Sequence, residues 1–170
     1  VGFLHSLYAL QEIMATKQKL ALDAIHVEQN LIGEAVGSQD QTAAAFGGLN
    51  KIEFGKDEEI QVSPIIMEKE KVRELENHLM LFFTGFTREA ATIAKVQIEN
   101  VQKNTNELMK MKDLVEEGIR ILRKGELKKF GELLHEGWLI KRKLASKISN
   151  EHIDDMYEKA RSAGAIGGKI

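Results

Sequence analysis

The residues best suited to chemistry lie between positions 28 and 49, where carboxylate, amide and hydroxyl side chains stand among glycines and alanines. Glu28 and Asp40 are the two carboxylates, twelve residues apart, and Asp40 follows the run Gly37-Ser-Gln39. One carboxylate can hold a metal ion that bridges phosphates and another can orient an attacking hydroxyl, so the pair suits phosphoryl transfer. A solvated rim residue beside a buried helical stripe is the alternative for Glu28.

Two basic features could bind an anion. Arg88 follows a short apolar run and stands beside Thr87 in a Thr-Gly-Phe-Thr-Arg turn. A guanidinium near hydroxyls and backbone amides can bind a phosphate or carboxylate through paired donors, although a surface arginine at a helix start is the alternative. The run Lys141-Arg-Lys143 is usually a solvated helix face, but it could present a cation to an anionic substrate.

Composition argues against several classes of protein. The formal net charge of -2 and the pI near 6.3 argue against binding to nucleic acid or to an anionic membrane surface. The chain has no cysteine, which fits a reducing compartment, and its five histidines lack metal-ligand spacing. It has no apolar run of the roughly 20 residues that a membrane-spanning helix needs. Since its start also lacks signal-peptide features, we expect a cytoplasmic protein.

The elements that must position these residues begin with two helices. Apolar residues from Phe3 to Met14 recur at helical spacing and predict a helix with one buried face. Thr16 is the expected N-cap of a second helix, which we expect to end at Gly33 and Gly37, before a polar bend over 37–41. The buried stripe of this helix is expected at Leu20, Ala24, Val27 and Leu31.

Strand patterns follow the polar bend. Residues 46–54 and 60–66, separated by turn residues at 55–57, predict a hairpin. The short apolar run 79–83, which follows a charged helical segment at 68–76, predicts one more strand.

The second half of the chain is predicted to be mostly helical. Apolar stripes lie within 90–101, 108–122 and 127–148. Gly125 is expected to end the second of these helices in a left-handed conformation, and Ser149 to cap a last helix ending at Gly164. Residues after Gly164 begin a strand-like pattern. The predicted class is therefore α+β with helix dominating, with a change of module between residues 62 and 70.

The order of these segments resembles the galactokinase, homoserine kinase, mevalonate kinase and phosphomevalonate kinase (GHMP) superfamily, and above all the bacterial D-glycero-D-manno-heptose 7-phosphate kinases. The resemblance covers nearly the whole chain and rests on four segments, which are 36–50, 81–88, 130–141 and 164–169. It implies that 1–66 is the remainder of the amino-terminal ATP and substrate domain. Residues 67–170 would then be a truncated, helix-rich carboxy-terminal domain of ferredoxin-like type.

The resemblance also implies a role for each candidate residue. Asp40 would act at the sugar hydroxyl as base or orienting carboxylate, and Glu28 would ligate Mg²⁺. Arg88 would lie near the phosphate of the sugar. The remaining substrate-binding candidates are Gly37, Gln39, Thr87 and Lys141.

The expected activity is that of an ATP- and Mg²⁺-dependent sugar kinase. It would transfer the γ-phosphoryl group to the anomeric hydroxyl of D-glycero-D-manno-heptose 7-phosphate, giving the 1,7-bisphosphate. A GHMP kinase of galactose, fucose or mevalonate type and a non-catalytic sugar-sensing relative are the alternatives. Because the two glycine-rich nucleotide segments of the family are not in the sequence, we expect a part of a longer kinase, inactive alone. ATP and a phosphorylated sugar are its expected partners, without nucleic acid or membrane.

Overall fold

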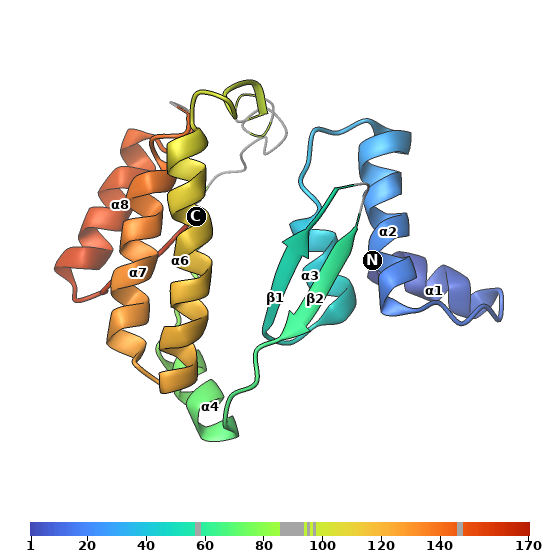
Figure 1. Ribbon diagram of the computed structural model, residues 1–170, viewed down its shortest axis with the longest axis horizontal. Helices are drawn as coiled ribbons and strands as arrows, with labels where there is room; N and C mark the ends of the chain where they lie inside the picture. Colours follow the sequence, from blue (N-terminus) through green and yellow to red (C-terminus); the bar gives the residue numbers. More distant parts are fainter. Residues whose placement is uncertain (57–58, 86–93, 95, 97, 146–147) are drawn as a thin grey trace. The chain divides into compact units, whose positions relative to one another are not determined.

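The computed structural model describes residues 1–56, 59–85, 94, 96, 98–145 and 148–170. Contacts within the chain divide it into two compact units, Val1–Ile66 and Met67–Ile170. Figure 1 shows the elements of each unit along the chain.

The first unit combines helices with a two-stranded sheet. Its elements in chain order are α1 (Gly2–Leu10), α2 (Lys17–His26), η1 (Val27–Ile32), α3 (Gln39–Phe46), β1 (Asn50–Phe54) and β2 (Ile60–Pro64). The π-helix η1 continues α2 directly, and α3 packs against α2. The core of this unit therefore lies between α2 and α3.

Helix α2 begins where the sequence predicts. Thr16 has an extended backbone, and its Oγ1 accepts a hydrogen bond from the Lys19 amide at 3.1 Å. Leu20 and Ala24 of the expected stripe are buried, whereas Leu31 is 69% exposed. The stripe ends because a π-helix has more residues per turn than an α-helix, so the spacing no longer keeps these residues on one face.

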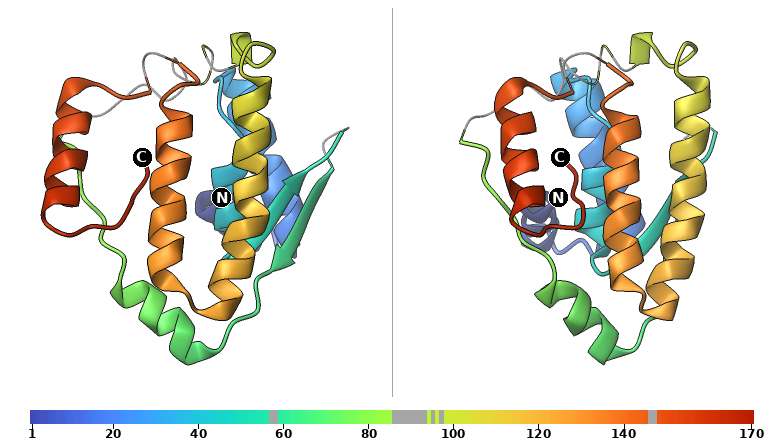
Figure 2. Two further views of the ribbon diagram at one scale, coloured as in Figure 1. Left: turned by 60° about the vertical axis from the view of Figure 1, so that its left-hand side comes forward. Right: turned by 90° about the vertical axis from the view of Figure 1, so that its left-hand side faces the viewer.

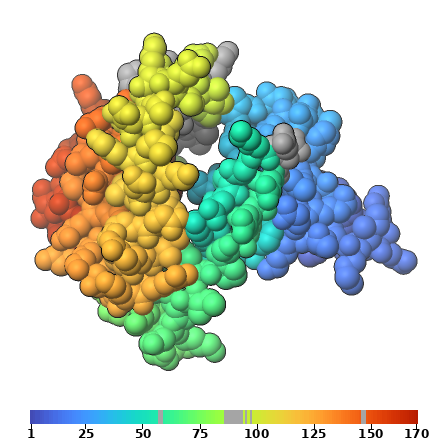
Figure 3. All heavy atoms as spheres, viewed as in Figure 1, coloured from blue at the N-terminus to red at the C-terminus, as the bar shows by residue number. Residues whose placement is uncertain are grey.

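Helix α1 does not have the buried face that its spacing predicts. None of its residues is buried, and Phe3 and Leu10 are 76% and 81% exposed. The helix also ends at Leu10 instead of Met14. In Figure 3 its atoms, in dark blue, stand out from the rest of the first unit. A helix buries a face only where another element packs on it, and little packs on α1.

The predicted hairpin is confirmed, with shorter strands. β1 and β2 are antiparallel in the register Asn50↔Pro64 to Phe54↔Ile60, and the Gly55 amide donates to Glu59 O at 2.8 Å. The first strand starts at Asn50 because α3 ends at Phe46 and residues 47–49 connect it to the strand. The glycine-rich composition of 37–48 does not predict this helix. Asp57, expected in the turn, lies outside the described residues.

The second unit is helical over the part that is described. Its elements are α4 (Lys69–Asn77), α6 (Thr105–Lys124), α7 (Leu127–Lys141) and α8 (Glu151–Ser162). Figure 2 shows α6, α7 and α8 side by side. Gly125, with φ +75°, ends α6 as predicted. The core cluster consists of Trp138, Leu144, Ala145, Ile148 and Ile153.

Two helix boundaries differ from the sequence prediction. Helix α7 ends at Lys141, so the buried Ala145 and Ile148 lie after the helix and not within it. Asn150 caps α8, since its Oδ1 accepts from the Ile153 amide at 2.9 Å. The hydroxyl of Ser149, the predicted cap, instead donates to Asp154 at 2.5 Å.

The strand predicted at 79–83 is absent. These residues have extended or irregular backbone, and Leu81 and Phe83 are 101% and 80% exposed. Strand structure needs the hydrogen bonds of a neighbouring strand, and no strand pairs with them in the described part of the second unit. The helix predicted at 90–101 falls mostly outside the described residues.

The tail after α8 also forms no strand. It lies against α7, where a Cβ on Gly167 would come within 1.9 Å of Gly131 O. This approach requires glycine at position 167. Across the described ranges of both units, no helix combines the length and apolar character needed to cross a membrane.

Candidate active site

The candidate metal ligand Glu28 lies in η1, the π-helix. It is partly buried, and the Glu34 amide donates to its carbonyl oxygen at 3.0 Å where η1 ends at Gly33. Gly33 adopts φ +77°, a left-handed conformation that glycine adopts readily. Insertions of this kind into α-helices are frequent at functional sites.

Gln41 links Glu28 to helix α3. Its Nε2 donates to Glu28 Oε2 at 2.5 Å, and the side chain is only 5% exposed. Gln41 is the third residue of α3 and directly follows Asp40. The Glu28 carboxylate therefore lies next to the first turn of the helix that carries the other candidate carboxylate.

Asp40 and Gln39 are exposed in that first turn. Ser38 precedes them as N-cap but makes no side-chain capping bond, and Gly37 is exposed just before it. The first amides of a helix lack intrahelical acceptors, and the helix dipole interacts favourably with a carboxylate there. The start of α3 thus presents Asp40 beside uncapped amides.

The loop before α3 is fixed by hydrogen bonds from two sides. Gln29 Nε2 of η1 donates to Val36 O at 2.9 Å and to Ser38 Oγ at 3.3 Å. The hydroxyl of Thr42, which is fully buried, donates to Ser38 O at 2.7 Å. Two adjacent residues of η1 therefore make these contacts. Gln29 holds the loop before α3, and Glu28 is bonded to α3 itself.

The other predicted substrate residues are placed differently. Lys141 is the last residue of α7, in the second unit, and its Nζ donates to Ile170 O at 2.9 Å. Thr87 and Arg88 lie outside the described residues. The first unit thus brings Glu28, Gly37, Gln39 and Asp40 together, while Lys141 belongs to the other unit.

The Glu28 carboxylate fits a magnesium ion only if phosphate oxygens and water supply the remaining ligands. No group of three His, Cys, Asp or Glu side chains that could hold a metal is found in the described portion of the chain. Mg²⁺ in phosphate-handling sites is typically held by one or two carboxylates plus phosphate oxygens and water. A single partly buried carboxylate, held by Gln41, is compatible with that arrangement.

A pocket of about 250 Å³ lies beside η1 in the first unit. Its lining comes from α2, η1, the loop before α3 and the end of the hairpin: Leu22, Ile25, His26, Gln29, Asn30, Ser38, Phe54, Gly55, Glu59 and Ile60. Neither Glu28 nor Asp40 is among these described lining residues. The candidate carboxylates therefore lie outside this pocket.

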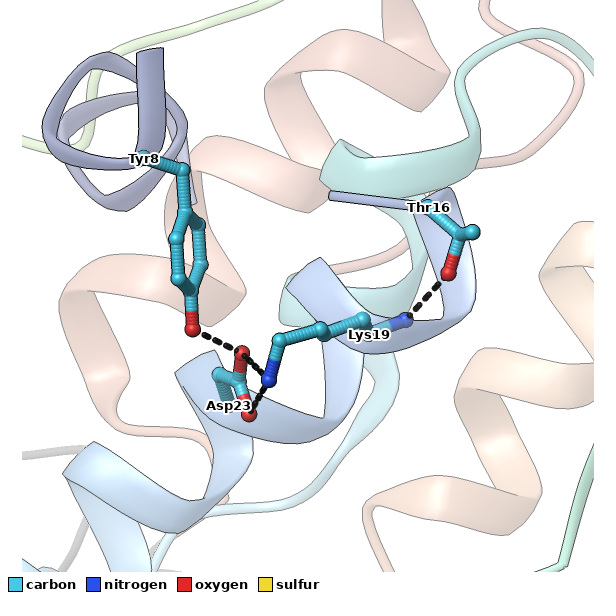
Figure 4. A network of polar contacts seen from close by, with 4 residues as sticks. All are labelled: Tyr8, Thr16, Lys19 and Asp23. Atoms are coloured by element: carbon cyan, nitrogen blue, oxygen red, sulfur yellow. Dashed lines mark hydrogen bonds and ion pairs between the residues drawn. The ribbon is translucent and has the colours of Figure 1, made fainter. Parts of the chain in front are cut away.

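A second polar network in the same unit ties α1 to α2 (Figure 4). The hydroxyl of Tyr8 donates to Asp23 Oδ2 at 2.5 Å, and Lys19 Nζ pairs with the same carboxylate at 3.0 Å. The Tyr8 hydrogen bond, helped by Lys19, lowers the pKa of Asp23 despite partial burial. In turn, the hydrogen bond to Asp23 raises the pKa of Lys19. This network stabilises structure and involves none of the candidate catalytic residues.

In the second unit, Tyr157 of α8 joins α7 in an aromatic cluster. Its hydroxyl lies 2.7 Å from His135 Nδ1, and the two rings stack with centroids 5.8 Å apart. Burial raises the pKa of Tyr157. Trp138 packs against the same ring at 6.0 Å. The cluster holds α7 and α8 together.

The role of Gln41 is not among the sequence predictions. The residue lies in the polar segment 28–49, but composition gives no sign that it is buried against Glu28. A helix over 39–46 would put Gln41 and Ala45 on one face, and that spacing is the available signal.

The chain is similar to several sugar kinases. Residues 119–170 match the family model described as GHMP kinases C terminal. The chain is 28% identical over 160 residues to the D-glycero-alpha-D-manno-heptose 7-phosphate kinase of Campylobacter jejuni, covering 89% of this chain and 45% of that protein. It is 27% identical over 138 residues to the bifunctional fucokinase/GDP-fucose pyrophosphorylase of Arabidopsis thaliana, covering 78% of this chain and 13% of that protein.

A solved structure is also similar to this chain. The crystal structure of a D-glycero-D-manno-heptose 1-phosphate kinase from Bacteroides thetaiotaomicron superposes with a TM-score of 0.74 at 28% identity, covering 98% of this chain and 45% of that one. The chain has the GHMP kinase fold, as its sequence predicts. It spans less than half the length of each of these three proteins.

Proposed function

We propose that this chain is the acceptor side of an ATP-dependent sugar kinase that phosphorylates D-glycero-D-manno-heptose 7-phosphate at its anomeric hydroxyl. The observation that carries the proposal is the Gln41–Glu28 hydrogen bond of 2.5 Å, which puts a candidate metal ligand beside the first turn of α3, where Asp40 is exposed. Phosphoryl transfer asks a protein mainly for positioning and charge stabilisation. Asp40 would supply the positioning, and a cation held by Glu28 would supply the charge stabilisation.

Asp40 is the proposed base or orienting carboxylate. It stands on a helix whose start is held through Ser38 by hydrogen bonds from Gln29 and Thr42. The backbone at Asp40 is therefore held, and only the Asp40 side chain is free to change its rotamer. A hydroxyl held by Asp40 in line with the γ-phosphorus would gain most of its reactivity from that placement. Asp40 would also accept the proton of the hydroxyl as the new phosphate ester forms.

Glu28 is the proposed ligand of Mg²⁺. Glu28 would hold the ion, which would supply positive charge against the negative charge of the nucleotide phosphates. Glu28 Oε2 accepts a hydrogen bond from Gln41 Nε2 at 2.5 Å.

The remaining candidate residues would bind the sugar phosphate. Gly37 and Gln39 flank the start of α3, where exposed backbone and amide groups can meet sugar hydroxyls. Arg88 and Thr87 would hold the existing phosphate, because a guanidinium matches phosphate oxygens in pairs. Lys141 would add positive charge.

The two units would correspond to two kinase domains. We propose that 1–66 is the remainder of the amino-terminal ATP and substrate domain and 67–170 a truncated carboxy-terminal domain. The match of 119–170 to the GHMP carboxy-terminal family supports the second assignment.

The direct test replaces Asp40 with asparagine in the full-length protein. We expect Asp40→Asn to lower kcat for ADP formation with heptose 7-phosphate by about 100-fold or more, because the isosteric amide cannot accept the proton. Asp113→Asn, the same change at an exposed position of α6, is the matched control. Turnover of Asp40→Asn within a few-fold of the wild type would show that Asp40 has no such role.

The position of the substrate phosphate needs its own test, because the two heptose kinases above are named for a 7-phosphate and a 1-phosphate. Assays with each sugar phosphate as acceptor separate the two. On the proposed function, heptose 7-phosphate is the substrate, and Arg88→Ala raises its KM while leaving the KM for ATP unchanged. Phosphorylation of heptose 1-phosphate alone would refute the choice of acceptor.

An unphosphorylated sugar is the second candidate. The likeness to the Arabidopsis fucokinase favours it, because that protein has a similar identity to this chain. Other GHMP substrates, such as galactose or mevalonate, and a sensor without catalysis belong to the same panel. Turnover with fucose or galactose but not with heptose phosphates would support this candidate, and binding of sugar without ATP consumption would support the sensor.

A further inference from the structure

Gln41 is a polar residue buried within the first unit, and only one end of its amide has a described hydrogen-bond partner. The side chain is 5% exposed, and its Nε2 donates to Glu28 Oε2 at 2.5 Å. Its Oε1 is also buried and has no hydrogen-bond partner among the described residues. Glu28 is thus the protein partner that holds this amide.

The orientation of the amide follows from the donor rules. An ionised carboxylate only accepts hydrogen bonds, so the amide must present Nε2 to Glu28 and leave Oε1 on the other side. Turning the amide over would bring two acceptor oxygens together. The Glu28–Gln41 pair therefore has one favourable arrangement, and it fixes the carboxylate as well as the amide.

Packing alone does not account for glutamine at this position. A buried acceptor without a partner is costly, and an apolar side chain of the same length would fill the space without that cost. The neighbouring Thr42, also buried, donates its hydroxyl hydrogen to Ser38 O. The hydrogen bond to Glu28 therefore explains why the side chain at position 41 is an amide.

We propose that Gln41 is a positioning residue that holds the Glu28 carboxylate in the orientation that binds the divalent cation. This inference rests on the proposed function, in which Glu28 is the metal ligand. Hydrogen-bonded partners of metal-binding carboxylates orient the ligand, and removing them typically weakens metal binding about 10- to 100-fold. Gln41 would act on the metal through Glu28, without contacting the substrate.

The test uses Gln41→Met, which keeps the length and volume of the side chain and removes the donor. Gln41→Asn keeps the amide but shortens its reach. Gln61→Met, on an exposed position of β2, is the matched control, and Glu28→Gln removes the ligand charge. Binding of Mn²⁺ to the full-length protein in the presence of ADP is measured by electron paramagnetic resonance, and thermal unfolding of each variant is recorded alongside.

We expect Gln41→Met to raise the Kd for Mn²⁺ by about 10- to 100-fold while its Tm stays at or above that of the wild type. Gln41→Asn should weaken Mn²⁺ binding as well, and Gln61→Met should not. A purely structural tie would instead lower Tm and leave Mn²⁺ binding intact. If Gln41→Met does not fold, Gln41→Asn decides the question by the same two measurements.

Two results would overturn the proposal, and they are distinguishable. In the first, Gln41→Met binds Mn²⁺ with wild-type affinity and Glu28→Gln loses affinity. This result would support Glu28 as a metal ligand and refute the positioning role of Gln41. Wild-type affinity in Glu28→Gln would refute the metal role of Glu28 itself, and the role of Gln41 with it.

Discussion

At the scale of single residues, the candidate chemistry depends on what each carboxylate touches. Glu28 is held by a buried amide, whereas Asp40 is exposed at the start of a helix. The first arrangement suits a fixed ligand, and the second suits a group that must reach a substrate. Asp23, another hydrogen-bonded carboxylate of this unit, is paired with Tyr8 and Lys19 and supports the fold.

Residue chemistry also predicts how stability depends on pH through Asp23. The Tyr8 hydroxyl holds the pKa of Asp23 below its ordinary value of 3.8. A lowered pKa in the folded state contributes stability above the ordinary pKa, and this contribution is lost as the pH falls through the folded value. Tyr8→Phe should raise the pKa of Asp23 and cost about 1 kcal/mol of stability at neutral pH.

The pKa of Asp23 is measured by NMR titration, and stability by urea unfolding of wild type and Tyr8→Phe at pH 7 and pH 3. The difference in stability should be largest at pH 7 and smaller at pH 3, because the contribution of the ionised Asp23 is lost progressively as the pH falls below the ordinary value of 3.8. An unchanged pKa of Asp23 in Tyr8→Phe would contradict the assignment.

At the scale of elements, local signals decided which predictions succeeded. Thr16 and Gly125 act through neighbours close in sequence, so the start of α2 and the end of α6 could be predicted. Helix α3 cannot be predicted from local sequence, because glycines surround it and its burial depends on packing against α2. The strand expected at 79–83 needs a partner that local sequence cannot supply.

Gly118 within α6 and Gly125 directly after it provide an element-scale prediction with opposite signs. Gly125 has φ +75°, so Gly125→Ala should cost about 1 kcal/mol through backbone strain. Gly118 is mid-helix, and a Cβ there would make ordinary contacts of 3.7 Å with Leu133 and Phe130. Gly118→Ala should therefore stabilise the protein by about 0.5 to 1 kcal/mol. Urea unfolding followed by Trp138 fluorescence measures both, and shifts in the same direction would refute this explanation.

At the scale of the whole molecule, the candidate site residues are divided between the two compact units. Glu28 and Asp40 lie in Val1–Ile66, whereas Lys141 lies in Met67–Ile170. The sequence indicated a change of module from the shift in composition, and the resemblance suggested roles for 28 and 40. The bond from Gln41 to Glu28 could not be predicted, because it depends on how η1 and α3 pack.

The two units should respond separately to matched helix-cap substitutions. Trp138 is the single tryptophan and lies in the second unit. Thr16→Ala and Asn150→Ala each remove a capping side chain, from α2 and α8, and should cost about 1 kcal/mol. We expect Asn150→Ala to shift the fluorescence midpoint in urea and Thr16→Ala to shift only the circular dichroism transition. An equal fluorescence shift from Thr16→Ala would mean that the units unfold as one.

The central claim is transfer of phosphate to the anomeric hydroxyl with Asp40 at the acceptor. Phosphorus NMR of the full-length protein with ATP, Mg²⁺ and D-glycero-D-manno-heptose 7-phosphate tests it most directly. The prediction is a new phosphate ester signal coupled to the anomeric proton, formed together with ADP, whose initial rate of formation is about 100-fold lower with Asp40→Asn. ATP that is not consumed by the wild type, or an equal initial rate with Asp40→Asn, would contradict the claim.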